Sequence, residues 1–534
     1  MIRIKGIKIP VEKNTKEELK NQISKKIKCR KEDIKEINIK KESIDARKKP
    51  NIFYVLEVDV NIENENRILK RNKNNKEIQK SPNEEYIYPK IGDKKLKYRP
   101  VIIGSGPAGL FCAYILSEKG YKPIIIERGE KVEDRIKTVE AFWKGEILNP
   151  NSNVQFGEGG AGTFSDGKLN TLTKDSEHRH KKVLEIFTQN GAPKEILYLH
   201  NPHIGTDILR QVIVNIRNNI IKKGGTFKYK STMTDIGVKD NKIESILINN
   251  NETIETDILV LAIGHSARDT FEMLLKNGIN IVPKPFAIGL RIEHPQELIN
   301  KNQYGELSKL LPPASYKLTY LTKEKRGVYS FCMCPGGFVV NASSEKGRIT
   351  TNGMSNNKRD TKNANSAIVV TVGPADYGNN PLDGIKYQRE LEEKFFNLEG
   401  GKVPIQLLKD FKTNTRTQKL GTITPIIKGK YQFSNLTKAL PAYITNSIKE
   451  ALPEFSKKIK CFDMDDAILS GIEARTSSPV RIPRDEKYES NIKGIYPCGE
   501  GAGYSGGIIT SSVDGIKIAE QIINLYSAFP NKNQ

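Results

Sequence analysis

The amino-acid sequence predicts an α/β fold with three parts: a parallel-sheet domain, a β-rich α+β domain inserted into it, and a small α+β domain at the N-terminus. Three observations support this prediction. An apolar strand, a glycine-rich turn and a helix follow one another from residue 100, and a second unit of this kind follows residue 494. Between them, residues 286–460 mix short strands and loops. The first 62 residues alternate apolar and polar positions around one helical stretch.

The N-terminal domain is predicted from this alternation. Thr15 precedes Glu17 and Glu18, which is typical of a helix start. We expect a strand, a helix and two further strands, in that order, over residues 2–11, 16–28, 34–43 and 52–62. Residues 63–97 are rich in Asn, Lys and Glu and contain few apolar residues, which predicts a linker or an exposed loop.

The clearest motif is the glycine-rich turn after the apolar residues 101–103. It consists of Gly104, Ser105, Gly106, Pro107, Ala108 and Gly109. Gly104 permits a tight turn, Gly106 lets the backbone approach a pyrophosphate, and Gly109 lets the following helix pack closely on the strand. The amino end of that helix presents unpaired amides and the positive end of its dipole to the phosphates. We therefore predict a Rossmann-like dinucleotide-binding unit.

An acidic residue stands where such a unit needs one. The apolar run 124–126 is followed by Glu127, whose carboxylate would accept hydrogen bonds from a ribose diol. We include its neighbour Arg128 in the predicted cofactor site. A further loop, residues 156–168, contains four glycines between 157 and 162. These would let backbone amides approach a flat or phosphorylated ligand, and a plain surface loop is the alternative.

Later segments complete the predicted parallel-sheet domain. Residues 207–223 have helical periodicity, and residues 258–264 form a buried strand that ends at Gly264. The second strand, turn and helix unit contains Gly499, Glu500, Gly506 and Gly507 and continues into a helix over 514–526. We expect the N-terminal domain and its linker at residues 1–95 and the first part of the cofactor domain at 96–285. An inserted substrate domain is expected at 286–460 and the return segment of the cofactor domain at 461–534.

Several phrases of the chain resemble a family of bacterial FAD-dependent dehydrogenases, within the NAD(P)/FAD-dependent oxidoreductases. They are Gly157 to Lys168, Gly264 to Asp269, Phe331 to Gly337, Arg475 to Arg481 and Cys498 to Gly507. The resemblance covers nearly the whole chain. It implies that the protein is a flavoprotein with FAD as the cofactor, and that hydride or two electrons pass between the flavin and a substrate.

The resemblance also assigns roles to the late glycine-rich motif. Its acid would bond the ribityl or pyrophosphate region of FAD, and Gly506 and Gly507 would lie near the ribityl chain and ring. Glu500 stands where Asp is more usual, so its distance from the cofactor is open. Gly264 corresponds to the last glycine of an Ala-Thr-Gly stretch. A second nucleotide fingerprint is absent, so NAD(P)H without a domain of its own, or a redox protein, remains the possible electron partner.

Other candidate residues have two interpretations each. Cys332 and Cys334 lie two apart, so on a strand they would share one face, as redox thiols or as small core residues. His265 follows the end of a strand and would donate a proton or orient the loop. Arg291, Arg475 and Arg481 would bind a small anionic substrate or form interdomain salt bridges. No metal site is expected, and no catalytic acid or base is assigned.

Bulk properties narrow the function. Six cysteines lack the spacing of zinc sites or of a redox disulfide, and we expect them to be reduced. No apolar run is long enough to span a membrane, which favours the cytoplasm. The net charge of +23 raises the alternative of an RNA-associated flavoprotein that docks through its basic N-terminal domain. The lysines are scattered and few aromatics accompany them, so we expect no nucleic-acid partner.

Overall fold

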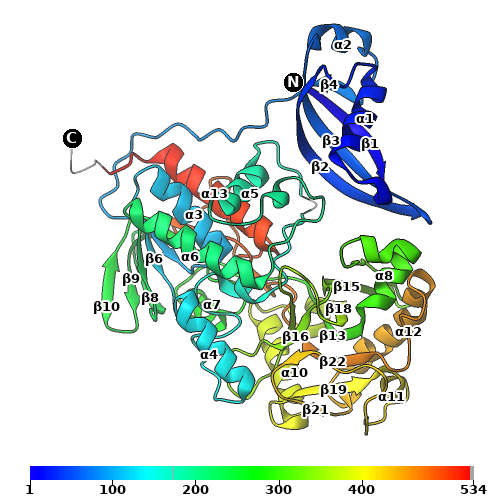
Figure 1. The fold of residues 1–534 in the computed structure, drawn as a ribbon. Helices are drawn as coiled ribbons and strands as arrows, with labels where there is room; N and C mark the ends of the chain where they lie inside the picture. Colours follow the sequence, from blue (N-terminus) through cyan, green and yellow to red (C-terminus); the bar gives the residue numbers. More distant parts are fainter. Residues whose placement is uncertain (172, 530–534) are drawn as a thin grey trace.

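A computed structural model describes residues 1–171 and 173–529. The N-terminal domain projects from the body of the molecule, and an extended segment connects the two (Figure 1). The body contains a Rossmann-like domain with a parallel sheet and an inserted domain built on a larger, mostly antiparallel sheet. The predicted fold class is therefore confirmed.

The N-terminal domain is a four-stranded antiparallel sheet, in the order β2-β3-β1-β4, packed against one long helix. Its elements are β1 (Ile2–Pro10), α1 (Lys16–Ile27), β2 (Ile34–Lys48), β3 (Asn51–Ile62), α2 (Glu65–Arg71) and β4 (Ile78–Lys80). The hydroxyl of Thr15 accepts the amide of Glu18 at 3.1 Å, as a helix cap does. The helix α2 and strand β4 lie within the segment predicted as a linker or loop, because Ile68 and Ile78 supply apolar contacts to the core.

The segment after β4 runs along the Rossmann-like domain. The hydroxyl of Tyr86 donates to Glu520 at 2.9 Å, and the amide of Gly92 donates to the carbonyl of Ile523 at 2.8 Å. These contacts fasten the chain to α13 (Ile508–Leu525), the last helix. The segment therefore packs as part of the body of the molecule.

The Rossmann-like domain has a five-stranded parallel sheet in the order β24-β11-β5-β6-β7. Its strands are β24 (Ile495–Pro497), β11 (Leu259–Leu261), β5 (Val101–Ile103), β6 (Ile124–Ile126) and β7 (Thr226–Lys228). Its helices are α3 (Pro107–Glu118), α4 (Val132–Lys144), α5 (Arg179–Gln189), α6 (Thr206–Lys222), α7 (Arg268–Lys276) and α13. A small antiparallel sheet is added by β8 (Met233–Lys239), β9 (Lys242–Ile248) and β10 (Glu252–Glu255). The helices α3 and α13 lie side by side (Figure 1) and pack on one face of the sheet, whereas the small antiparallel sheet and α7 pack on the other, so the strand residues are apolar on both faces.

The inserted domain has a seven-stranded sheet in the order β14-β15-β18-β13-β22-β19-β21. Its strands are β13 (Phe286–Pro295), β14 (Thr319–Leu321), β15 (Gly327–Cys334), β18 (Asn363–Val372), β19 (Val403–Leu407), β21 (Tyr431–Phe433) and β22 (Ile468–Glu473). Its helices are α8 (Gln296–Tyr304), α9 (Pro374–Tyr377), α10 (Asp383–Glu399), α11 (Leu408–Lys412) and α12 (Ala442–Lys458). Short strands β16 (Phe338–Asn341), β17 (Thr351–Met354) and β20 (Ile427–Lys428) form a further sheet, and β12 (Val282–Pro283) pairs with β23 (Val480–Arg481).

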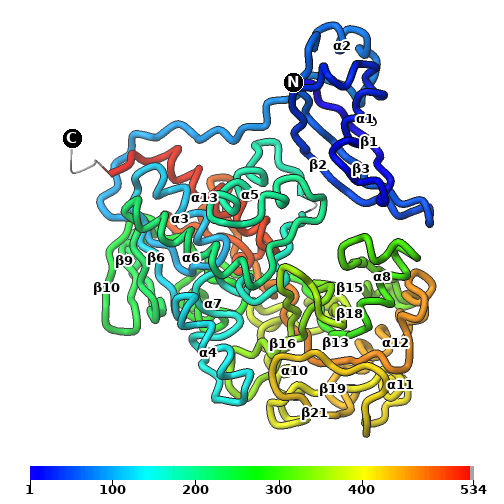
Figure 2. The backbone as a smooth tube through the Cα atoms, in the orientation of Figure 1, coloured from blue at the N-terminus to red at the C-terminus, as the bar shows by residue number. Residues whose placement is uncertain are grey.

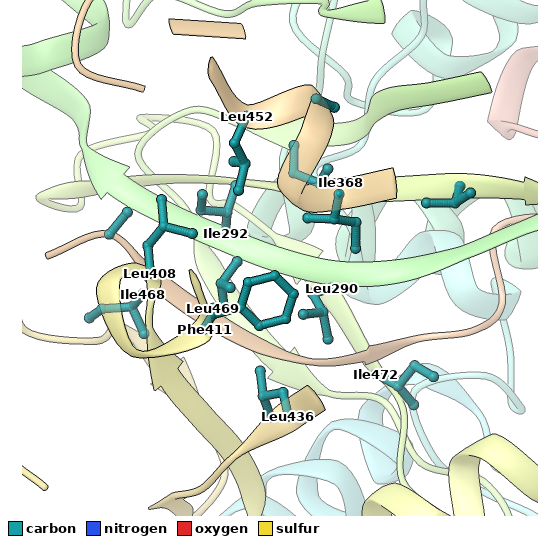
Figure 3. Packing of buried hydrophobic residues seen from close by; sticks show 14 of the residues in the cluster. Leu290, Ile292, Ile368, Leu408, Phe411, Leu436, Leu452, Ile468, Leu469 and Ile472 are labelled. Carbon is teal, nitrogen blue, oxygen red and sulfur yellow. The ribbon is translucent and has the colours of Figure 1, made fainter. Parts of the chain in front are cut away.

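Apolar side chains hold this sheet to its helices. Leu290, Ile368 and Ile468 from the strands meet Phe411 of α11 and Leu452 of α12, and all five are buried (Figure 3). Packing of this kind stabilises the domain through the hydrophobic effect. The strand β22 pairs with β13 and β19, so the chain returns to the Rossmann-like domain after the end of β22, beyond the expected boundary at 460/461.

The N-terminal domain contacts both parts of the body. The amide of Glu42 donates to the carbonyl of Tyr198, and the amide of His200 donates to the carbonyl of Glu42, each at 2.8 Å. The β2–β3 hairpin reaches toward α8 (Figure 2), where Ile52 and Leu311 are buried in a small apolar cluster. The hairpin therefore bridges the Rossmann-like and inserted domains.

Candidate cofactor and substrate site

One large cavity, of about 760 Å³, lies between the Rossmann-like domain and the inserted domain. Gly106, Glu127 and Glu500 line it from the first, and Phe331 and Asn352 line it from the second. Of the predicted cofactor residues, those that line the cavity are Gly104, Gly106, Pro107, Ala108, Glu127, Arg128, Gly264, Glu500, Gly506 and Gly507. Ser105, Gly109 and Gly499 lie behind the wall and support it.

The order of strands arranges these residues along one edge of the sheet. Glu127 follows β6, Gly104 follows β5, Gly264 follows β11 and Glu500 follows β24, and these four strands are neighbours in that order. Ligands of α/β proteins bind at the carboxyl ends of the strands. A dinucleotide with its adenosine ribose at β6 and its pyrophosphate at β5 would therefore extend toward β11, β24 and the inserted domain.

The glycine-rich turn has the shape that a pyrophosphate requires. A Cβ atom at Gly109 would lie 1.9 Å from the carbonyl oxygen of Gly104, so the helix approaches the strand too closely for any side chain. At Gly106 a Cβ atom would meet only the Cα of Gly160, at 3.8 Å, so this position is open to the cavity. Gly106 also precedes α3 without a side-chain cap. The first amides of α3 are therefore available to an anion, and the turn fits a dinucleotide phosphate.

Glu127 is buried and accepts four hydrogen bonds. Its Oε2 accepts the amide and the hydroxyl of Ser105, and its Oε1 accepts the amides of Gly129 and Gly157. The carboxylate thus joins the phosphate turn to the second glycine-rich loop. Its neighbour Arg128 lies over the ring of Phe156 at 4.5 Å and forms an ion pair with Asp269 at 2.9 Å.

The second glycine-rich loop is held by an arginine that the sequence did not single out. Arg135 of α4 is fully buried, and its guanidinium donates to five backbone carbonyls. They belong to Asn153, Val154, Gly157, Glu158 and Gly160. Burial lowers the pKa of Arg135 to about 9. A lone arginine in a helical stretch gives no sequence signal for this role.

The late glycine-rich motif is held in place by Asp514 of α13. The amide of Gly499 donates to Oδ2 of Asp514 at 2.7 Å, and Arg484 pairs with the same carboxylate. Glu500 faces the cavity, with its Oε1 3.2 Å from Nδ1 of His265. The exposed residues Gly506 and Gly507 line the cavity at the amino end of α13.

Arg475, one of the predicted arginines, lines the cavity but is held in a buried ion-pair cluster. Glu392 of α10 accepts paired hydrogen bonds from Arg268 of α7 and from Arg475, at 2.7–2.9 Å. Burial opposes ionisation of Glu392, but the two guanidinium charges outweigh it and lower its pKa to about 2. Arg291 pairs in the same bidentate manner with Glu473. These arginines therefore connect the domains and strands.

Arg481, the third predicted arginine, does not line the cavity. It is exposed and lies over the ring of Tyr504 at 5.1 Å.

The two cysteines of β15 both line the cavity but differ in exposure. A bulge between Phe331 and Cys334 interrupts the pairing with β18, and Cys332 has a positive φ of 43°. Cys332 is consequently exposed to the cavity, whereas Cys334 is buried and donates from Sγ to the carbonyl of Cys332 at 3.3 Å. Desolvation by the cavity walls raises the pKa of Cys332 to about 12.

Two lysines give the inserted-domain end of the cavity a positive charge. Lys168 lines it, and its Nζ is 3.9 Å from Oδ2 of Asp166, which already accepts hydrogen bonds from Arg359 and Ser355. Lys317 is exposed, also lines the cavity, and forms no ion pair with any described residue. Neither lysine was singled out as a binding residue from the sequence.

The described residues contain no group of three or more His, Cys, Asp and Glu side chains arranged to hold a metal ion. No helix within residues 1–171 and 173–529 has both the length and the apolar character needed to cross a bilayer.

The fold and the cavity define the class of protein: one with a single Rossmann-like domain, an inserted domain and a cavity between the two. Residues 285–476 match the family model described as "FAD-dependent protein, C-terminal domain-like", and residues 102–153 match that of an NAD(P)-binding Rossmann-like domain. Residues 1–61 match a domain of unknown function. An "uncharacterized protein" of Clostridium beijerinckii is 49% identical over 532 residues, which span 98% of this chain and 99% of that protein.

The chain belongs to this family of FAD-dependent proteins, and FAD is its cofactor. Among solved structures it is similar to L-proline dehydrogenase from P. horikoshii, with 13% identity over 81% of this chain and 94% of that one and a TM-score of 0.34. It is also similar to glycine oxidase from Bacillus cereus, with 11% identity over 80% and 97% and a TM-score of 0.32. Likenesses of this size say nothing about the substrate.

Proposed function

We propose that the protein is an FAD-dependent dehydrogenase or reductase that acts on a small anionic substrate. The observation that carries this proposal is the single continuous cavity. It joins the phosphate turn at one end to Lys168 and Lys317 at the other. Two lysines at the end of a cofactor cavity, of which Lys317 forms no ion pair with any described residue, favour a carboxylate or phosphate group on the substrate.

Each part of the wall has a role in this proposal. The first amides of α3 would bind the pyrophosphate, Glu127 the adenosine ribose, and Gly264, Glu500 and the amino end of α13 the flavin half of the cofactor. Bound FAD supplies a ring that accepts or donates two electrons. The protein supplies orientation, excludes water with the inserted domain, and neutralises the substrate's negative charge through the lysines.

The alternative of an RNA-associated flavoprotein has no comparable support. Tyr54, an aromatic side chain of the N-terminal domain, packs in the small cluster with Leu311. In this position the side chain of Tyr54 contacts the inserted domain.

A visible spectrum under anaerobic conditions tests the redox part of the proposal. The purified protein should show an FAD spectrum that bleaches on addition of NADH, NADPH or a reducing substrate. A spectrum that bleaches only with NAD(P)H would define a reductase half-reaction, whereas bleaching by an organic acid would define a dehydrogenase. An FAD spectrum that no such donor changes would contradict both.

A matched pair of lysine variants tests the anionic part. Small carboxylates should perturb the flavin spectrum with a saturable Kd. We expect Lys168→Gln to weaken that Kd roughly 10- to 100-fold, because a charge-assisted hydrogen bond contributes about 1.5–3 kcal/mol. Lys323→Gln, at a turn outside the cavity, should leave the Kd unchanged. Equal affinities in the two variants would argue against an anion site at Lys168.

A further inference from the structure

His265 stands out among the cavity residues because one of its ring nitrogens has no partner. It directly follows Gly264 after β11 and is 9% exposed. Its Nδ1 faces Oε1 of Glu500 at 3.2 Å. Its Nε2 is buried and forms no hydrogen bond with any described residue. A buried polar nitrogen without a partner is unfavourable, so this atom is suited to meet a ligand in the cavity.

The position of His265 indicates which half of the ligand it would meet. It lies after β11, next to the strand β24 that carries Glu500, whereas Glu127 lies after β6 on the other side of the phosphate turn. A dinucleotide with its adenosine at Glu127 therefore brings its flavin half to His265.

Charged groups lie on two sides of the imidazole. Glu500 is the acid that faces it, with Lys284 and Arg481 beyond that carboxylate. On the other side Ser266 separates it from Arg475, whose charge is compensated by Glu392. Arg268 and Asp269, on the same segment, are paired with Glu392 and Arg128.

We propose that Nε2 of His265 hydrogen-bonds to the bound flavin and takes up a proton when the flavin is reduced, while Glu500 holds the ring through Nδ1. The inference deepens the proposed function and rests on it. Two electrons and one proton convert the oxidised flavin into a reduced form with one negative charge. A second proton, taken from solvent, ends on Nε2 and balances that charge. Imidazole suits this task because it ordinarily titrates between pH 5 and 8.

The pH dependence of the flavin midpoint potential tests this step. Uptake of two protons per two electrons makes the potential fall twice as steeply with pH as uptake of one. We expect the steeper slope for the wild-type holoprotein near neutral pH and half that slope for His265→Gln, whose amide can form hydrogen bonds but cannot take up a proton.

Two controls keep the test decisive. His180→Gln removes a histidine outside the cavity and should keep the steeper slope. If His265→Gln does not retain FAD, proton uptake on photoreduction of the wild-type protein in weak buffer gives the answer instead. One proton per two electrons in the wild type, or an unchanged slope in FAD-loaded His265→Gln, would overturn the inference. Photoreduction needs no substrate, so these outcomes are distinct from failure of the proposed function.

Discussion

The hydroxyl of Ser105 donates a hydrogen bond of 2.7 Å to Oε2 of Glu127, and the amide of Ser105 donates to the same atom at 3.0 Å. The acid predicted to bind a ribose therefore also fixes the turn predicted to bind the pyrophosphate. Any substitution of Glu127 therefore alters the fold of the turn as well as the proposed cofactor contact.

A pair of substitutions separates these effects. Glu127→Ala leaves the donors of Ser105, Gly129 and Gly157 buried and unpaired, so we expect loss of FAD and a free energy of unfolding lower by several kcal/mol, at about 1–3 kcal/mol for each unsatisfied donor. Ser105→Ala removes one donor only and should cost about 0.5–1.5 kcal/mol with FAD retained. Denaturant unfolding and the flavin spectrum measure both. Glu127→Ala with full FAD content would refute the ribose assignment.

Two glycines of the turn should respond differently to the same added methyl group. Gly106→Ala places it at the open position, so we expect an unchanged free energy of unfolding and weaker FAD binding. Gly109→Ala drives it into the carbonyl of Gly104, so we expect a destabilised fold. Thermal unfolding of the apoproteins and FAD titration distinguish the two. A Gly106→Ala protein with normal FAD affinity would show that the pyrophosphate lies elsewhere.

The contrast between these glycines illustrates what the sequence could predict. The turn, the helix α3 and Glu127 are consecutive in the chain, so local spacing was sufficient to place them. The partners of Glu127 at Gly157, and the contact of Glu500 with His265, depend on long-range packing that no local pattern encodes. The bulge between Phe331 and Cys334 also has no local signal in the sequence, and around it Cys332 is exposed and Cys334 buried although both line the cavity.

Acid should weaken the Glu392 cluster in a defined pH window. The pKa of this carboxyl is lowered to about 2 in the folded protein, so its contribution to stability is present above about pH 4.5 and is lost as the pH falls toward 2. The shift corresponds to about 3 kcal/mol. At neutral pH, Glu392→Gln removes the carboxylate shared by Arg268 and Arg475, leaves Glu345 as their remaining ion-pair partner, and should cost up to about 3–5 kcal/mol.

The comparison is made by unfolding wild-type and Glu392→Gln protein between pH 7 and 2. The difference in their free energies should shrink as the pH falls through that window. Glu393→Gln alters the next residue of α10, whose side chain is 57% exposed, and should match the wild type throughout. A difference that stays constant with pH would mean that Glu392 is not ionised in the folded protein.

Cys332 provides a test of whether its thiol acts as a nucleophile. With the pKa raised to about 12, only about one thiol in a hundred thousand is ionised at pH 7, so we expect slow alkylation despite exposure to the cavity. The alkylation rate should rise about tenfold for each pH unit through pH 9, since the thiolate is the reacting form. Mass spectrometry of the labelled peptide follows the rate, and Cys332→Ser identifies the peptide. A rate that levels off below pH 9 would instead reveal an activated thiolate, and would restore Cys332 as a candidate for covalent chemistry beside the flavin.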